Sequence, residues 1–165
     1  MENDKVLQTE VSPGAQPGCE APSSNRILVV DDEAEVRQVS AEVLMRFGYH
    51  VDTAADGAAG WEALHAKRYD LLITDNKMPK ITGVELVTKV RSARMALPVV
   101  LVSSAIPTED LNRIPSLQLA AMLLKPFTPG ELLGTVRDVL RVVESTRDRA
   151  TIDGPGIGTH PGSLI

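Results

Sequence analysis

Short apolar runs alternate with segments of helical periodicity through the middle of the chain. Runs such as Ile27 to Val30 predict strands, and apolar residues spaced three and four apart predict helices. The expected strands are 27–30, 49–53, 69–74, 97–102 and 120–124. Apolar residues expected on helix faces are Val36, Val39, Val43, Leu44, Phe47, Trp61, Leu64, Leu86, Val87, Val90, Leu132, Val136, Leu140 and Val143. Strands that are continuously apolar are typical of a parallel sheet covered on both faces. Repeated β–α units therefore predict an α/β fold: an open, doubly wound domain with five strands and five helices.

Cap signals mark where several helices begin. Asp56 precedes one helix, and Thr82 and Thr128 each stand three residues before a glutamate, which is capping-box spacing. The fourth helix, expected within 108–118, is the weakest pattern because it contains Pro115.

The two ends of the chain lack this periodicity. Residues 1–24 and 146–165 are rich in Pro, Gly and Ser, so we expect a disordered N-terminal segment and a flexible C-terminal tail around a domain at 25–145. The net charge of −5 divides into −3, zero and −2 over the N-terminal, C-terminal and middle parts, which does not favour nucleic-acid binding. The chain has one cysteine, no apolar run long enough for a membrane span and no visible secretory signal, so we expect a cytoplasmic protein.

Polar residues interrupt the apolar runs where the expected strands end. Asp31 and Asp32 follow the first strand, Asp75 follows the third, Ser103 the fourth and Lys125 the fifth. Because the functional crevice of an open α/β sheet lies outside the carboxyl ends of its strands, these side chains should share one site. Clustered carboxylates repel one another unless a cation lies among them, and their oxygens suit Mg²⁺. A lysine and a hydroxyl beside the metal are what a phosphoryl group needs, and a carboxylate is a competent nucleophile towards phosphorus.

These motifs resemble the receiver domain of two-component response regulators. The matching stretches are "ILVVDDE", "DLLITDNKMP" followed by "TGVEL", "PVVLVSS" and "LLKPF", and the resemblance covers about residues 26–144. It implies a flavodoxin-like fold with strand order 2-1-3-4-5. It also implies a phosphoprotein that receives its phosphoryl group from a sensor histidine kinase or a histidine phosphotransfer protein docked near the first helix. The domain's own Mg²⁺ and lysine would promote the transfer, so we expect no separate enzymatic activity.

The resemblance also implies a role for each residue of the site. Asp75 would be the phosphoacceptor, and Asp32 would ligate Mg²⁺ directly, with Asp31 acting partly through water. Asp75 itself and the backbone carbonyl of Lys77 would complete the protein ligands of the metal. Lys125 would contact the phosphoryl oxygens. Ser103 would be the hydroxyl that swings towards the phosphate. The peptide bond between Lys125 and Pro126 would be cis.

Three departures from the family pattern concern the output surface. Met122 stands where many receivers carry an aromatic switch residue, Ser104 replaces a smaller residue, and Pro115 falls in the fourth helix. No helix-turn-helix pattern, basic region or catalytic motif follows Glu144, so we expect a stand-alone receiver without a DNA-binding domain or membrane attachment. It would signal by protein contact or phosphorelay to an unidentified target, and it could form a homodimer.

The sequence leaves three other function classes open. One is a phosphorylation-independent adaptor with the receiver fold, which Met122 and Pro115 slightly favour. Another is an aspartate-nucleophile phosphatase, although that class carries Asp-x-Asp at its first strand and this chain has Asp31, Asp32 and Glu33 instead. A nucleotide or flavin binder fits least, because the chain has no glycine-rich phosphate loop.

Overall fold

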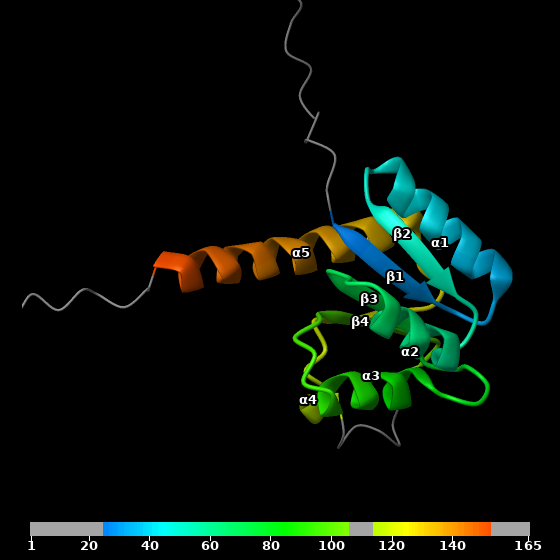
Figure 1. Ribbon diagram of the computed structural model, residues 1–165. Helices are drawn as coiled ribbons and strands as arrows, with labels where there is room; N and C mark the ends of the chain where they lie inside the picture. Colours follow the sequence, from blue (N-terminus) through cyan, green and yellow to red (C-terminus); the bar gives the residue numbers. More distant parts are fainter. Residues whose placement is uncertain (1–24, 106–113, 153–165) are drawn as a thin grey trace, which may run out of the picture.

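Five strands form one parallel sheet in a computed structural model that describes residues 25–105 and 114–152. The strands are β1 (Arg26–Val30), β2 (His50–Ala54), β3 (Leu71–Asp75), β4 (Val99–Ser103) and β5 (Ala121–Leu124). Their order in the sheet is β2-β1-β3-β4-β5, and every neighbouring pair is parallel (Figure 1). The expected α/β class, the doubly wound sheet and its strand order are confirmed.

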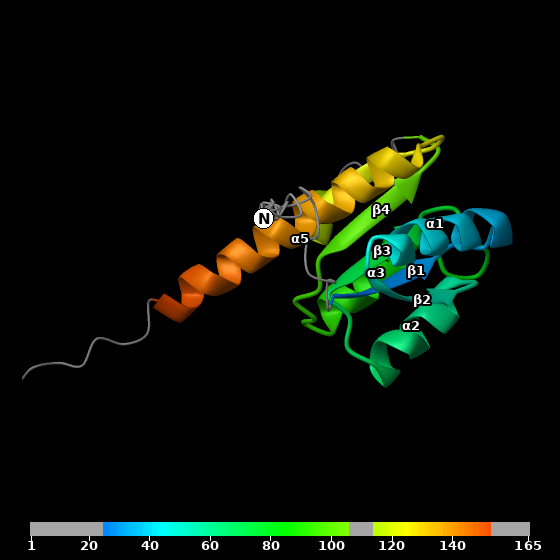
Figure 2. The ribbon, with the colours of Figure 1, turned by 90° about the horizontal axis from the view of Figure 1, so that it is seen from above.

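Within the described ranges, five helices cover both faces of this sheet. They are α1 (Ala34–Arg46), α2 (Gly57–Ala66), α3 (Gly83–Ser92), α4 (Ile114–Leu117) and α5 (Pro129–Ile152). Residues of α1 and α5 pack in one hydrophobic cluster, and residues of α2, α3 and α4 pack in another. Figure 2 shows the sheet between these helices from a second direction.

The alternation of side chains along each strand divides the core into these two clusters. In β1, Leu28 and Val30 face the cluster of α2 and α3, whereas Ile27 and Val29 face the cluster of α1 and α5. This is the physical reason for the uninterrupted apolar runs: a strand with helices on both faces has no side exposed to water.

Helix caps lie where the sequence placed them. The Asp56 carboxylate accepts a hydrogen bond from the backbone N–H of Ala59 at 2.8 Å. Thr82 and Glu85 form a complete capping box, and the Thr128 hydroxyl accepts from the Glu131 N–H at 3.2 Å. These caps fix where α2, α3 and α5 begin, and therefore the length of the loops beside the strand ends.

Two features of the helices differ from the sequence prediction. Helix α5 continues to Ile152, seven residues beyond the domain end expected at 145, and it projects past the edge of the sheet (Figure 1, Figure 2). Its exposed turns carry hydroxyl groups that bond to backbone carbonyls four residues earlier, and Arg147 pairs with Asp70 at 3.8 Å. Val39 and Phe47, expected on the buried face of α1, are 53 % and 51 % exposed.

Parts of the expected organisation lie outside the described residues. These are residues 1–24, most of the expected fourth helix at 108–118 and the chain beyond Ile152. Within the described part, α4 spans only Ile114–Leu117. No helix there has the length and apolar character that crossing a membrane requires.

Candidate functional site

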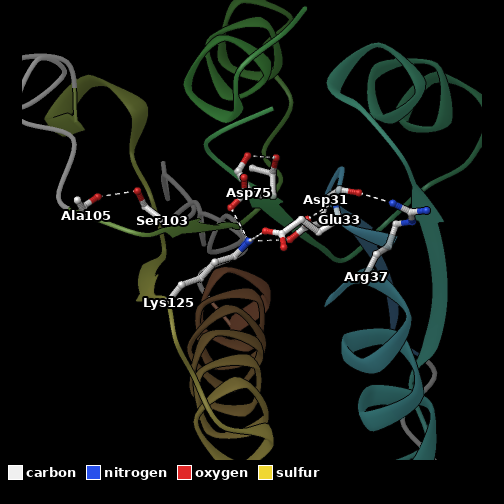
Figure 3. A network of polar contacts seen from close by, with 8 residues as sticks. Asp31, Glu33, Arg37, Asp75, Ser103, Ala105 and Lys125 are labelled. Carbon is white, nitrogen blue, oxygen red and sulfur yellow. Dashed lines mark hydrogen bonds and ion pairs between the residues drawn. The ribbon is translucent and has the colours of Figure 1, made fainter. Parts of the chain in front are cut away.

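The carboxyl ends of four strands bring the predicted site residues to one edge of the sheet. Asp31 follows β1, Asp75 ends β3, Ser103 ends β4 and Lys125 follows β5. The Lys125 ammonium lies 3.0 Å from Asp75 Oδ1 and 3.2 Å from Asp31 Oδ2 (Figure 3). A single cation therefore bridges carboxylates from two neighbouring strands.

Glu33 is a third carboxylate on the same lysine, and the sequence analysis gave it no role. Its Oε1 atom lies 3.3 Å from Lys125 Nζ. The Glu33 side chain is 64 % exposed, whereas those of Asp31 and Asp75 are 6 % and 5 % exposed. The only sequence signal for it was its position next to Asp31 and Asp32. The contact spans 92 residues of chain, so periodicity alone did not indicate it.

Hydrogen bonds hold Asp31 in place at the start of α1. Its Oδ1 atom accepts from the backbone N–H of Glu33 at 2.8 Å, which leaves Oδ2 for Lys125. Arg37, one turn into α1, donates to the backbone carbonyl of Asp31 (Figure 3). The N-cap of α1 is Glu33, which makes no side-chain cap bond. The chain therefore enters α1 through the hydrogen bond between Asp31 and the Glu33 N–H, and no side chain caps this helix at its N-cap residue.

Lys125 balances only part of the negative charge of the carboxylates around it. Burial raises the pKa of Asp75, and the neighbouring Asp31 carboxylate raises it further, while Lys125 opposes both effects. Burial alone would lower the pKa of Lys125, but its hydrogen bonds with Asp75 and Asp31 outweigh burial and raise it. Lys125 therefore remains charged at neutral pH, and a further cation would balance the remaining negative charge of the carboxylates around it.

The donor atoms at this edge fit Mg²⁺. Asp31, Asp32 and Asp75 offer carboxylate oxygens, Asp32 is exposed, and the Lys77 backbone carbonyl follows two residues after Asp75. In the two described ranges, no three carboxylate, imidazole or thiol groups are already gathered as a metal site. Mg²⁺ does not need such a cluster, because it binds through one or two carboxylates and keeps several waters.

The loop after β3 is fastened close to the Asp75 backbone. Asn76 donates its N–H to Val102 at 2.8 Å, and its side-chain oxygen accepts from the Val84 N–H at 3.2 Å. Gly83 opens α3 so near this loop that a Cβ atom there would lie 2.3 Å from the Asp75 carbonyl oxygen. Glycine permits this close approach, so the first turn of α3 packs directly against the backbone of Asp75.

Ser103 is buried at the end of β4, and its hydroxyl donates to the Ala105 carbonyl at 2.6 Å. Figure 3 shows this contact beside, and separate from, the Lys125 cluster. The peptide bond between Lys125 and Pro126 is cis. Met122, at the position of the expected switch residue, is half-buried and packs against the cluster of α2 and α3.

A hollow of about 570 Å³ adjoins the site between α1 and the loop that leads into α5. Its lining combines the charged Glu33 and Lys125 with the exposed Val39 and the half-buried Val36 and Phe127. Exposing an apolar side chain such as Val39 to water is unfavourable, and this exposed side chain lies on the wall of the hollow.

Comparison with known proteins matches the chain to one family. The model of the response regulator receiver domain matches residues 27–137. The chain is 31 % identical over 120 residues to the alkaline phosphatase synthesis transcriptional regulatory protein PhoP of Bacillus subtilis, covering 72 % of this chain and 49 % of PhoP. It is 34 % identical over 118 residues to the transcriptional regulatory protein CusR of Escherichia coli, covering 70 % of this chain and 51 % of CusR. The chain thus spans about half the length of these curated relatives.

Solved structures agree with this match. The chemotaxis response regulator CheY4 of Vibrio cholerae superposes with a TM-score of 0.65 at 33 % identity, covering 71 % of this chain and 99 % of CheY4. The response regulator TrrA of Thermotoga maritima, in complex with Mg²⁺ and BeF, gives a TM-score of 0.62 at 30 % identity, covering 70 % of this chain and 98 % of TrrA.

Proposed function

Because this chain belongs to the response regulator receiver family, we propose that it accepts a phosphoryl group on Asp75 in a Mg²⁺-dependent reaction. The observation that carries the proposal is the Lys125 ammonium, which lies within 3.2 Å of both the Asp75 and the Asp31 carboxylates. A buried carboxylate beside a fixed cation is a nucleophile with a neighbouring group to neutralise the incoming phosphoryl.

The chemistry is a phosphoryl transfer from a phosphohistidine of a kinase or phosphotransfer protein. A carboxylate oxygen of Asp75 forms a bond to phosphorus while the bond from phosphorus to the histidine nitrogen breaks, and the freed imidazole takes up a proton. Lys125 balances charge on the phosphoryl oxygens. Ser103, whose hydroxyl bonds to Ala105 in this structure, turns to donate to the phosphoryl group.

The metal would be held by oxygen atoms of this edge. We assign Asp32 as a direct ligand, Asp31 as a ligand partly through water, and Asp75 and the Lys77 carbonyl as the remaining protein donors. When bound, Mg²⁺ supplies positive charge for the transferring phosphoryl group. Lys125 contributes its charge from the residue after β5, where salt bridges hold it beside Asp31 and Asp75.

The hollow beside the site supports docking of the phosphodonor between α1 and the β5–α5 loop. It joins Lys125 to the exposed Val39 and the half-buried Phe127. A partner helix with an apolar stripe would bury these groups next to Asp75. After phosphorylation, the domain would act by contact with a target protein or pass the phosphoryl group on.

Acetyl phosphate tests the chemistry without a partner. Purified protein with Mg²⁺ should gain a single phosphoryl adduct by intact mass, and Asp75→Asn should gain none. Asp138→Asn, a matched change on the exposed side of α5, should label like the wild type. Lys125→Met should bind Mg²⁺ but form the adduct at least about tenfold more slowly, as expected from losing a charge-assisted contact. Labelling that persists in Asp75→Asn would sink the assignment.

A second variant tests the docking surface separately. Val39→Asp should label normally with acetyl phosphate but lose transfer from the cognate kinase, found by screening purified histidine kinases of the source organism. Unchanged transfer from that kinase would remove α1 from the docking surface.

A further inference from the structure

A second hollow lies at the opposite edge of the sheet, where the strands begin. Its volume is about 610 Å³, and it is formed by the end of α2, the loops that follow α2 and α3, and the projecting part of α5. The lining includes four basic residues and one acidic residue: Lys67, Arg68, Arg94, Arg147 and Asp70. This is an excess of positive charge in one place on a chain whose net charge is −5.

The acidic residue offsets only part of the positive charge of the hollow. Asp70 already accepts a hydrogen bond from the backbone N–H of Arg26 at 2.9 Å and pairs with Arg147 at 3.8 Å. Lys67 is paired with Asp52 outside the hollow at 3.1 Å. Arg68 and Arg94 make no ion pair with any residue of the described ranges, so two guanidinium groups face the same space without a carboxylate partner.

Two features of the backbone bring Arg94 and Arg147 to the hollow. Arg94 has a φ of 55°, the left-handed conformation in which glycine is the least strained residue after a helix. Arg147 reaches the hollow only because α5 runs beyond its buried part, which ends near Val143. A shorter α5 and a glycine at position 94 would leave the core intact and remove two of the four basic residues of the hollow.

The floor of the hollow is apolar. Leu64, Met95 and Leu97 line it, and Leu64 and Leu97 belong to the buried core. Guanidinium groups bind phosphate oxygens in pairs, while an apolar floor accepts a ring or an aliphatic body. The volume of about 610 Å³ lies in the range typical of small-molecule sites, and we therefore favour a small ligand over an acidic peptide.

From these contacts we propose that the hollow binds a small ligand that carries two or more phosphate groups, with Arg68, Arg94 and Arg147 as the groups that contact them. The site is remote from Asp75, and its existence does not depend on the phosphotransfer proposed for that residue.

Titration of the ¹⁵N-labelled 165-residue chain tests this site with ADP, pyrophosphate and adenosine as probes. EDTA in the buffer keeps metal–nucleotide complexes away from the carboxylates around Asp75. ADP and pyrophosphate should give saturable shifts of amide resonances within 64–70 and 94–97 and at Arg147, and adenosine should give none. The double variant Arg68→Gln/Arg94→Gln should weaken binding at least about tenfold, the effect of losing charge-assisted hydrogen bonds.

Two further variants keep the test decisive. Arg94→Gly removes the cation and relaxes the left-handed residue, so it should fold at least as well as the wild type yet bind more weakly. Arg46→Gln removes an exposed arginine outside the hollow and should bind normally. The proposal is overturned by any of three results: no shifts at millimolar probe, shifts spread evenly over all basic residues, or unchanged affinity in the double variant. Acetyl phosphate labelling of the same samples reports separately on Asp75.

Discussion

Gly83→Ala is the change that most directly tests how α3 positions Asp75. A Cβ atom built at residue 83 would lie 2.3 Å from the Asp75 carbonyl oxygen and 2.9 Å from the Asn76 Cα atom. Both neighbours are backbone atoms, so no side chain can rotate away. Restoring ordinary contact requires a displacement of about 1 Å, given a favourable separation near 3.5 Å.

The magnitude follows from two opposing effects. Overpacking of this kind costs roughly 1–3 kcal/mol of folding free energy, and alanine in place of glycine returns up to about 1 kcal/mol of helix propensity. We therefore expect a net destabilisation of about 1–2 kcal/mol. A shift of about 1 Å at a reacting group can reduce a rate by roughly 100-fold, so phosphorylation should slow by at least about tenfold.

Gly134→Ala is the matched control. Gly134 lies inside α5, and an added Cβ would meet no atom within 4 Å. The same substitution should stabilise the protein by roughly 0.5–1 kcal/mol there and leave labelling unchanged. Urea unfolding and the initial rate of acetyl phosphate labelling measure both quantities. A Gly83→Ala protein with wild-type stability and labelling rate would refute the claim that the α3 start and Asp75 are rigidly coupled.

Three other predictions concern separate parts of the domain. Arg91 donates to the backbone carbonyls of Met95, Leu97, Leu117 and Gln118, so Arg91→Gln should lower the free energy of unfolding by roughly 2–4 kcal/mol; a urea midpoint equal to that of the wild type would contradict this. Burial and the hydrogen bond to Asp52 raise the pKa of Tyr69 to about 12. The folded state therefore retains a proton that the unfolded state loses above about pH 10, and stability should fall between pH 10 and 12. Tyr69→Phe should flatten that decline in thermal melts, and an equally steep decline would assign it to other groups. Lys77→Ala should tighten Mg²⁺ binding a few-fold by calorimetry, because it removes a like charge beside the metal ligands, and weaker binding would show that Lys77 instead supports the loop.

The fold was predictable because its strands are buried on both faces. The runs around Leu28, Leu72 and Val100 have no polar side to obscure the pattern, and caps at Asp56, Thr82 and Thr128 punctuate the helices. Once the order of elements is known, parallel strands place Asp31, Asp75, Ser103 and Lys125 at one edge. The proximity of these residues was therefore a consequence of topology.

Other features could not be predicted because they depend on contacts between distant residues. The Glu33–Lys125 ion pair joins residues of two different loops, and neither residue type is unusual in a loop. The last turns of α5 are charged and lack apolar periodicity, so the domain was predicted to end at 145, although no glycine or proline occurs between that residue and Gly154. The apolar spacing of Val39 and Phe47 predicted burial, but periodicity does not distinguish a face packed on the core from one exposed beside a hollow.

The division of the core by the sheet has a consequence for how this domain tolerates change. Leu28 and Ile27 are adjacent in sequence but belong to clusters on opposite faces, separated by the backbone of the sheet. Substitutions in different clusters share few neighbours, so their effects on stability should add, whereas those within one cluster should couple. Two destabilising substitutions should therefore cost the sum of their separate effects when they lie in different layers, and a different total when they lie in the same layer.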